Sequence, residues 1–484
     1  MSTNKPPREL HGKRLFGYSL GDLGFSLPNI FTEVFIFQYY VYTVNLNALL
    51  VSIGVTIQLI VGAITAIIFG VIIDNKSPGK LGKRRPFLLI GLPLWCITTI
   101  VVWFPPLCPQ NNSIFFPTAF FFWGMTIVRS IFRSLILNVY NSMLPEQSQT
   151  LKNRERVASF RSAFSILASV LAMFLPLFVH SLLSDPLNVK WWEPSGKTML
   201  LYIPLVGIIF TTFGLITVII IFFSVDESFH SRNSNLNHQK TTIKEAFMRM
   251  SIPIKDRNLV KLILAGLFIW ISGKIVALLV FPFQTYLMQF KSSEFFIYIL
   301  ISIFGKFGWF FIWKKILRRN LIVKSFSNCI LLAVLTSFID IFFFIKILPF
   351  AIKLILYIVS WSTVLGSMYA YPLFSIPIMA SLVHETAEND KIFNVDEAMA
   401  KISGSYYGLE SFARALGPAI ASLFVGSVLS GPNEENPYVI IFLFVSLGIF
   451  YLFAFIFVRR IKLSKDSYYN RNFVRKDKVS LELV

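Results

Sequence analysis

Charged side chains are scarce in this sequence of 484 residues. Asp, Glu, Lys and Arg together make up 14% of the chain, whereas soluble domains carry roughly 25%. Apolar residues make up 55%, including 51 Phe, and the mean hydropathy is +0.66. This composition excludes a soluble globular protein and indicates a chain embedded in the lipid bilayer.

Acidic residues are scarcer than basic ones, 25 against 45, which gives a net charge of +20. A basic balance of this size is also typical of nucleic-acid binding. Here, however, Lys and Arg gather in short loops between apolar segments and form no separate domain. The positive-inside rule explains such loops, so we expect no nucleic-acid partner.

Cysteine and histidine are too few and too scattered to build a site. The three Cys fall in two apolar segments and one loop, so they imply no disulfide framework. The five His show no metal-ligand spacing, and no glycine loop could cradle phosphate. We therefore expect that the protein binds no metal and no cofactor, and that it is neither an enzyme nor an ATP-driven pump. The first apolar segment is too long for a cleavable signal peptide and is expected to remain in the mature protein.

Twelve apolar segments are long enough, at about 20 residues, to cross a bilayer as helices. They are residues 16–42, 47–73, 86–104, 115–140, 157–182, 200–224, 260–288, 294–313, 321–344, 351–383, 402–430 and 437–458. Asp340 falls near the end of one span, and we assign it no role. The pattern predicts an all-α membrane protein.

Charge alternates between the connecting loops. The amino end, the loop 74–86 and the tail are basic, whereas loops 105–114 and 431–437 contain no Lys or Arg. Basic loops mark the cytoplasmic side. We therefore expect a multi-pass protein of the plasma membrane with both termini in the cytoplasm.

The spans divide into two groups of six. We expect a bundle at 1–224, a cytoplasmic linker at 225–259, a second bundle at 260–458 and a basic tail at 459–484. Thr242 and Glu245 have the spacing of a capping box that opens a short amphipathic linker helix. Two bundles of six favour a transporter, although a twelve-span enzyme or scaffold would have the same count.

Polar side chains line one face of the first span. Asp22, Ser26, Asn29 and Glu33 are spaced so that eleven residues at 100° return to within about 20° of the start. An ionisable group at membrane depth costs roughly 2.5–3.5 kcal/mol, so it indicates function. The alternative is that Asp22 and Glu33 only pair with basic residues of a neighbouring span.

Four motifs spread over most of the chain resemble one transporter family. They are Gly17 to Gly24 with Asp22, Gly82 to Phe87, Val139 to Glu146 followed by Arg156 and Arg161, and Ser405 to Phe412 followed by Arg414. The chain resembles the glycoside-pentoside-hexuronide cation symporters of the major facilitator superfamily, the melibiose permease group. The resemblance implies two six-helix bundles, alternating access and a sugar or glycoside substrate.

The chain departs from that family where the coupling cation binds. The family's second-span motif has two Asp residues, the second followed by Pro, and it aligns with Gly62, Ala66 and Ile67, so both acids are missing here. Asp22 with Gln58 and Thr65 offers few oxygen ligands for Na⁺. The resemblance therefore does not carry Na⁺ coupling to this chain. We expect a proton-coupled carrier or an uncoupled facilitator.

Cations inside the spans suggest what replaces the bound ion. Arg129 and Arg133 lie one turn apart in the fourth span. A fixed guanidinium near a carboxylate supplies the charge of a cation, and we hypothesise that these arginines pair with Asp22 and Glu33. A purely structural ion pair is the alternative.

The second half repeats this pattern. Ser403, Tyr407, Glu410 and Arg414 share a helix face, and Lys274 is a further cation within a span. The residues predicted to line the substrate path are therefore Asp22, Asn29, Glu33, Gln58, Arg129, Arg133, Lys274, Tyr407, Glu410 and Arg414. Alternatively, Glu410 and Arg414 only satisfy each other.

The basic loop after the second span suggests a gate. Asp74 with Arg84 or Arg85 could form a cytoplasmic charge network that breaks and reforms during transport. The alternative is that these charges only orient the hairpin.

Taken with the resemblance, the sequence predicts a monomeric secondary carrier of a sugar or glycoside, with a proton as the expected coupling ion. The excess of basic groups keeps an anionic substrate open, either a hexuronide or a lysolipid. A transport-inactive receptor or scaffold also remains open, because the family's cation site is lost.

Overall fold

The computed structural model describes most of the chain. The described residues are 9–77, 79, 81–82, 84–148, 151–226, 242, 244–245, 248, 252–317, 319–345, 347–388 and 395–463.

Twelve α-helices make up this described part. Those of the first half are α1 (Gly12–Gln38), α2 (Ala48–Asn75), α3 (Arg85–Val101), α4 (Phe116–Gln147), α5 (Leu151–Ser181) and α6 (Pro194–Ser224). Those of the second half are α8 (Arg257–Pro282), α9 (Phe296–Leu317), α10 (Ile322–Ile339), α11 (Phe350–Glu388), α12 (Val395–Val428) and α13 (Pro437–Arg459). Apart from an isolated bridge between Gly79 and Gly82, the described residues contain no β-structure.

Each of the twelve predicted spans coincides with one of these helices. Ten helices in the described residues are long and apolar enough to cross a membrane by length and composition alone. Of the other two, α3 is apolar but has 17 residues, and α1 has 27 residues that include Asp22 and Glu33. The all-α membrane fold predicted from the apolar pattern is confirmed.

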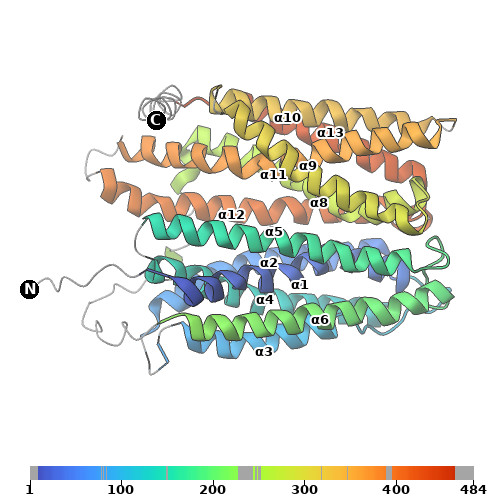
Figure 1. Ribbon diagram of the computed structural model, residues 1–484, viewed down its shortest axis with the longest axis horizontal. Helices are drawn as coiled ribbons and strands as arrows, with labels where there is room; N and C mark the ends of the chain where they lie inside the picture. Colours follow the sequence, from blue (N-terminus) through green and yellow to red (C-terminus); the bar gives the residue numbers. More distant parts are fainter. Residues whose placement is uncertain are drawn as a thin grey trace, which may run out of the picture. The chain divides into compact units, whose positions relative to one another are not determined.

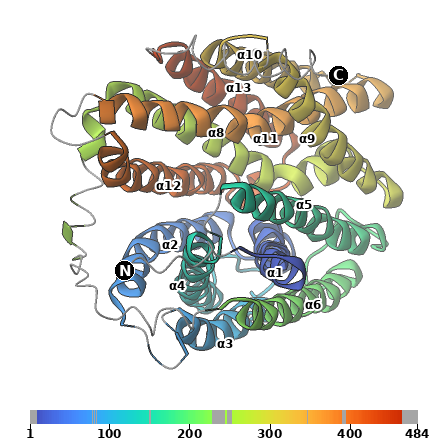
Figure 2. The same cartoon turned by 60° about the vertical axis from the view of Figure 1, so that its left-hand side comes forward.

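The chain forms two compact units. One comprises Met1–Ala246 with Lys291–Phe296, and the other comprises Phe247–Phe290 with Ile297–Val484. In the first unit α1 packs against α5 and α6, and α3 packs against α4 and α6 (Figure 1 and Figure 2). In the second unit α8 packs against α12 and α13, and α10 packs against α11 and α13. These four helix pairings therefore recur in both units in the same chain order.

A local repeat accompanies this shared packing. Both α1 and α8 run into a π-helical turn, η1 (Tyr39–Thr43) and η4 (Phe283–Leu287). In residues 39–46 one backbone N–H donates to the carbonyl five residues back and another to the carbonyl six residues back, at 2.9 Å each. Asn45 of this segment has a positive φ of +69°. In residues 283–290 the same bonds measure 2.9 and 3.0 Å around Gln289 with φ +53°. The backbone thus shows an internal repeat that side-chain identity hides.

Small residues set how closely α1 approaches α6. A Cβ atom added at Gly17, Gly21 or Gly24 would overlap side chains of α6, including that of Thr217 against Gly24. Small residues at such spacing let helices pack backbone to backbone in a membrane. Three glycines of the first motif therefore serve helix packing.

The predicted capping box is present at the start of the linker helix. The Glu245 N–H donates to Thr242 Oγ1 at 3.2 Å, and the Thr242 N–H donates to Glu245 Oε2 at 3.1 Å. Most other residues of the expected linker, Phe247 among them, lie outside the described residues.

Candidate functional site

Two arginines near the middle of α4 reach the polar face of α1. Arg129 Nη2 donates to Asn29 Oδ1 at 2.9 Å, and Arg133 Nη2 forms an ion pair with Glu33 Oε1 at 2.9 Å. Asn29 and Glu33 are one turn apart on α1, as the two arginines are on α4. The structure therefore brings together four of the residues predicted to bind substrate.

These two pairs differ in burial. Arg129 is 1% exposed and its Nε has no hydrogen-bond partner among the described residues. In contrast, the Arg133 and Glu33 side chains keep exposures of 30% and 39%. Arg129 is thus a buried guanidinium that donates to a neutral amide, whereas Arg133 is paired with a carboxylate.

The predicted pairing of the arginines is half right. Arg133 pairs with Glu33 as expected, but Arg129 does not pair with Asp22. Asp22 lies seven residues before Asn29 on α1, about 10 Å along the helix axis. A guanidinium bonded to Asn29 cannot also reach Asp22 at that separation.

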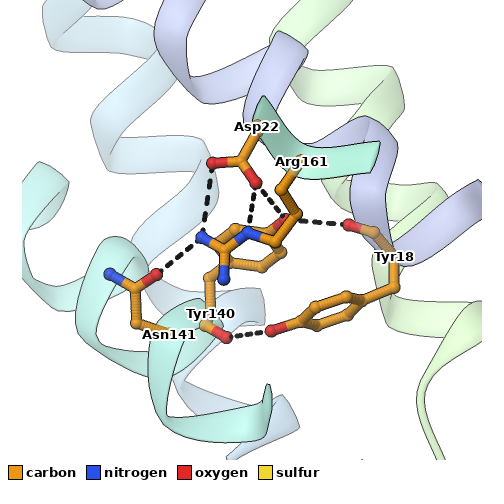
Figure 3. A network of polar contacts seen from close by, with 5 residues as sticks. All are labelled: Tyr18, Asp22, Tyr140, Asn141 and Arg161. Atoms are coloured by element: carbon orange, nitrogen blue, oxygen red, sulfur yellow. Dashed lines mark hydrogen bonds and ion pairs between the residues drawn. The ribbon is translucent and has the colours of Figure 1, made fainter. Parts of the chain in front are cut away.

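Asp22 is instead held by Arg161 of α5 (Figure 3). Arg161 Nε pairs with Asp22 Oδ2, and its Nη2 lies 3.3 Å from Asp22 Oδ1 and 2.9 Å from Asn141 Oδ1. The side chains of Arg161 and Asp22 are 19% and 20% exposed. Sequence reasoning missed this role, although the motif that ends in Arg161 contained the signal.

Two tyrosines complete this network (Figure 3). Tyr18 and Tyr140 stack with ring centroids 4.9 Å apart, and each hydroxyl donates to the other's backbone carbonyl, at 2.7 and 2.9 Å. Tyr140 also lies within hydrogen-bond distance of Asp22 Oδ2, at 3.0 Å, and the Arg161 guanidinium lies 4.6 Å from the Tyr140 ring centroid. The carboxylate therefore lies beside a guanidinium and a tyrosine hydroxyl whose one hydrogen can go either to Asp22 or to the Tyr18 carbonyl.

A second face of α4 is bonded to α2. Ser130, Ser134 and Asn138 donate to the carbonyls of Gln58, Gly62 and Ala66 at 2.7, 3.0 and 2.6 Å. The donors and the acceptors both repeat every four residues, so three hydrogen bonds at successive turns join the two helices. Gln58 is 5% exposed and its Oε1 has no partner in the described part of the chain.

The second unit places its predicted residues on α8 and α12. Glu410 and Arg414 form an ion pair at 2.6 Å, which is the self-satisfying alternative considered from the sequence. The Arg414 guanidinium also lies 5.1 Å from the ring of Trp270, one turn before Lys274 on α8. Tyr407 is 41% exposed, and the side chain of Ser403 lies outside the described ones.

The three predicted gate residues occupy the connection from α2 to α3. Arg84 is 6% exposed at the start of α3, and the Arg85 guanidinium lies 5.1 Å from the Phe222 ring of α6. The side chain of Asp74 is outside the described ones, so its pairing stays a prediction. No group of three or more His, Cys, Asp or Glu that could hold a metal occurs in the described ranges.

Comparisons with known proteins give the setting for this geometry. Residues 17–430 match the family model described as MFS/sugar transport protein. An uncharacterized symporter of Bacillus subtilis, YjmB, is 25% identical over 190 residues, 39% of this chain and 38% of that protein. An uncharacterized symporter of Synechocystis is 23% identical over 189 residues, 38% of this chain and 34% of its own. The chain thus matches about a third of the length of these relatives.

Solved transporters share the fold. The nucleoside transporter NupG has a TM-score of 0.62 at 13% identity, covering 93% of this chain and 100% of that one. A D-xylose-proton symporter has a TM-score of 0.61 at 14% identity, covering 94% and 98%. A bacterial homolog to the human lysosomal transporter Spinster has a TM-score of 0.62 at 15% identity, also covering 94% and 98%. At these identities the likeness concerns the fold alone.

Proposed function

Because the chain belongs to the MFS/sugar transport protein family, we propose that it is a secondary carrier of a sugar that bears a carboxylate, a hexuronide. The family makes transport of a small molecule the expected activity, and the charges of the first unit narrow the substrate class. One observation carries this choice: Arg129 is buried in the middle of α4 and donates to a neutral amide.

The charge balance around Arg129 favours an anionic ligand. The nearby carboxylate of Glu33 is already paired with Arg133, and Arg129 Nε has no partner among the described residues. One carboxylate, Glu33, therefore lies near two guanidinium groups, and a buried charge that is compensated only in part costs free energy. A substrate carboxylate would offset that cost and fits the planar, two-pronged guanidinium.

Neutral polar groups nearby suit the hydroxyls of a sugar. Gln58 offers a buried Oε1 without a partner, and its backbone carbonyl is bonded to Ser130, the residue next to Arg129. Asn29 offers a side-chain amide beside the same guanidinium. Buried polar groups left unpaired by the protein favour a ligand that can pair them.

We further infer that both termini face the cytoplasm and that the carrier acts as a monomer in the plasma membrane. The support for the orientation is the basic loop 74–86 and the basic tail, against loops 105–114 and 431–437 without Lys or Arg.

Uptake by purified protein in liposomes tests the substrate class. With methyl glucuronide and methyl glucoside as matched probes, we expect saturable flux of the glucuronide. Arg129→Ala should lower that flux about 30-fold or more, since truncating a buried charge partner costs 2–5 kcal/mol. The flux of Arg129→Lys should lie between that of wild type and that of Arg129→Ala, because lysine keeps the positive charge but loses the two-pronged hydrogen bonding of the guanidinium. The exposed Arg319→Ala is the control.

Three results would contradict the proposal. Equal flux of both probes, unchanged in Arg129→Ala, would indicate a carrier of neutral glycosides. Flux of a lysolipid alone would indicate the lipid alternative. Binding of the glucuronide without flux would indicate a receptor.

A further inference from the structure

Asp340 is an acid enclosed within the second unit. It opens η6 (Asp340–Phe344), the 3₁₀ turn that follows α10, and its side chain is 0% exposed. Ser360 Oγ of α11 donates to Asp340 Oδ2 at 2.7 Å, while Oδ1 has no hydrogen-bond partner among the described residues. Half of this carboxyl group is therefore unsatisfied.

No cation offsets this acid in the part of the chain that the structure describes. Its ion pairs join other residues, and Asp340 has no interaction with Lys, Arg or His among them. A single serine hydroxyl does not compensate for burying an ionised carboxylate, whose desolvation costs several kcal/mol. A proton on Oδ1 removes the charge and with it most of that cost.

A second unsatisfied oxygen belongs to Gln284, whose partner lies on α11 as the partner of Asp340 does. Gln284 of η4 donates through Nε2 to the Tyr357 hydroxyl at 2.9 Å, and Gln284 Oε1 has no partner among the described residues. Tyr357 and Ser360 are three residues apart on α11, so their side chains point to neighbouring directions of one face. Two buried polar pairs with free acceptor oxygens therefore sit within about one helical turn.

Aromatic rings pack together next to the residues of these two polar pairs. Phe283 lies between Phe343, at 5.3 Å, and Trp361, at 5.5 Å between ring centroids, and Trp361 stacks on Phe444 at 4.8 Å. Such a shell lowers the local dielectric and strengthens the penalty for charge.

Titratable groups also lie on the elements packed against η6. On α11, from its start to Ser360, they are Tyr357 and Lys353, the latter two turns before Ser360, or about 10 Å along the axis. On α13 they are Tyr438, Tyr451 and Arg459, the last residue of the helix, and on α10 they are Lys324, in the first turn, and the buried Cys329. Phe344 of η6 stacks on Tyr438 at 6.2 Å.

We propose that Asp340 is a proton-binding site and that the proton it holds couples to transport. The carboxyl group takes a proton from water when a conformational change hydrates it, and carries that proton in the enclosed state described here. This inference rests on the proposed function, because it names the coupling ion of that carrier. No sodium ion is required at Asp22, which Arg161 already neutralises.

Transport in liposomes tests the coupling with Asp340→Asn, which keeps the shape and removes the acid. Wild-type protein should accumulate methyl glucuronide about tenfold for each unit of an imposed pH gradient. The variant should accumulate none above equilibrium but should still exchange internal for external glucuronide. The control is Asp185→Asn, an exposed loop acid that should accumulate normally. Accumulation by Asp340→Asn equal to wild type, or driven by Na⁺ in wild type, would overturn the proposal.

Infrared spectroscopy provides a test that needs no substrate. Wild-type protein at neutral pH should show the carbonyl band of a protonated carboxylic acid that is missing from Asp340→Asn. In Ser360→Ala, which keeps the acid, this band should shift because one hydrogen bond is lost. Absence of the band in wild type would overturn proton binding even if glucuronide flux is observed. Presence of the band without flux would sustain the site and reject the proposed substrate.

Discussion

At the scale of single residues, Arg161 decides what Asp22 can do. Its guanidinium occupies the position at Asp22 that a bound cation would need. A fixed positive charge stabilises the ionised carboxylate and competes with Na⁺ for it. The second span adds no acid where the resemblance places the family's two carboxylates, because Gly62 and Ala66 stand at those positions. Asp22 is therefore part of a protein-internal ion pair in the described state.

A double-mutant cycle on Asp22 and Arg161 measures whether this pair acts as a unit. Asp22→Asn and Arg161→Gln should each lower glucuronide uptake about tenfold or more, because each leaves a largely buried charge without its partner. The double variant should lose much less than the product of the two effects. Glu9→Gln, in the exposed contact with His11, is the control and should transport normally. Independent, multiplying losses would show that Asp22 acts through another partner.

At the scale of helices, the first unit uses backbone contact on one side and polar contact on another. The glycines of α1 allow α6 to approach closely, while three side chains of α4 donate hydrogen bonds to backbone carbonyls of α2. In lipid, helix association depends on such packing and on hydrogen bonds between helices. The lipid tails are as apolar as the helix surfaces, so no hydrophobic effect drives the helices together. These contacts place Arg129 and Arg133 toward α1.

Replacing Gly24 tests the close approach of α1 and α6. In Gly24→Ala the added methyl group would overlap Thr217, and overpacking typically costs about 1–3 kcal/mol. The midpoint of thermal unfolding of the detergent-purified protein should fall. Gly124→Ala is a matched control on α4, because a Cβ there meets nothing within 4 Å, and it should leave the midpoint unchanged or raise it. An equal midpoint for both variants would contradict the close contact.

At the scale of the whole molecule, two similar units carry different charges. The units repeat the packing of helices and the π-helical turns. Yet α4 holds two arginines mid-helix, whereas residues 354–383 of α11, its counterpart, contain no charged side chain. The family predicted from the motifs is confirmed by the match over residues 17–430. The similar packing is therefore shared by both units, whereas the arginines on which the proposed anion recognition rests lie in the first unit.

Cysteine labelling in whole cells tests the orientation. The three native thiols are buried and should not react with a membrane-impermeant maleimide. A cysteine introduced at the exposed Asn111 should react in intact cells, and one at Lys462 should react only after permeabilisation. Reaction at Lys462 in intact cells would place the termini outside.

The sequence by itself determined the helices, their number and the family. Span positions follow from local hydropathy, the capping box at Thr242 follows from three residues' spacing, and the motifs are read in order along the chain. It also predicted that the arginines of α4 pair with carboxylates of α1, which holds for Arg133 and Glu33. Each of these properties depends on residues that are close in sequence or on a charge pattern that helix periodicity makes visible.

Only the tertiary structure decided which charges meet. The pairing of Asp22 with Arg161, the neutral partner of Arg129 and the enclosure of Asp340 depend on which helices adjoin and at what depth. Hydropathy does not encode these, because several helix arrangements bury the same apolar faces equally well. The close packing at the α1 glycines and the hydrogen bonds from α4 side chains to α2 carbonyls select one arrangement of the helices. That arrangement fixes the distances between the charged side chains.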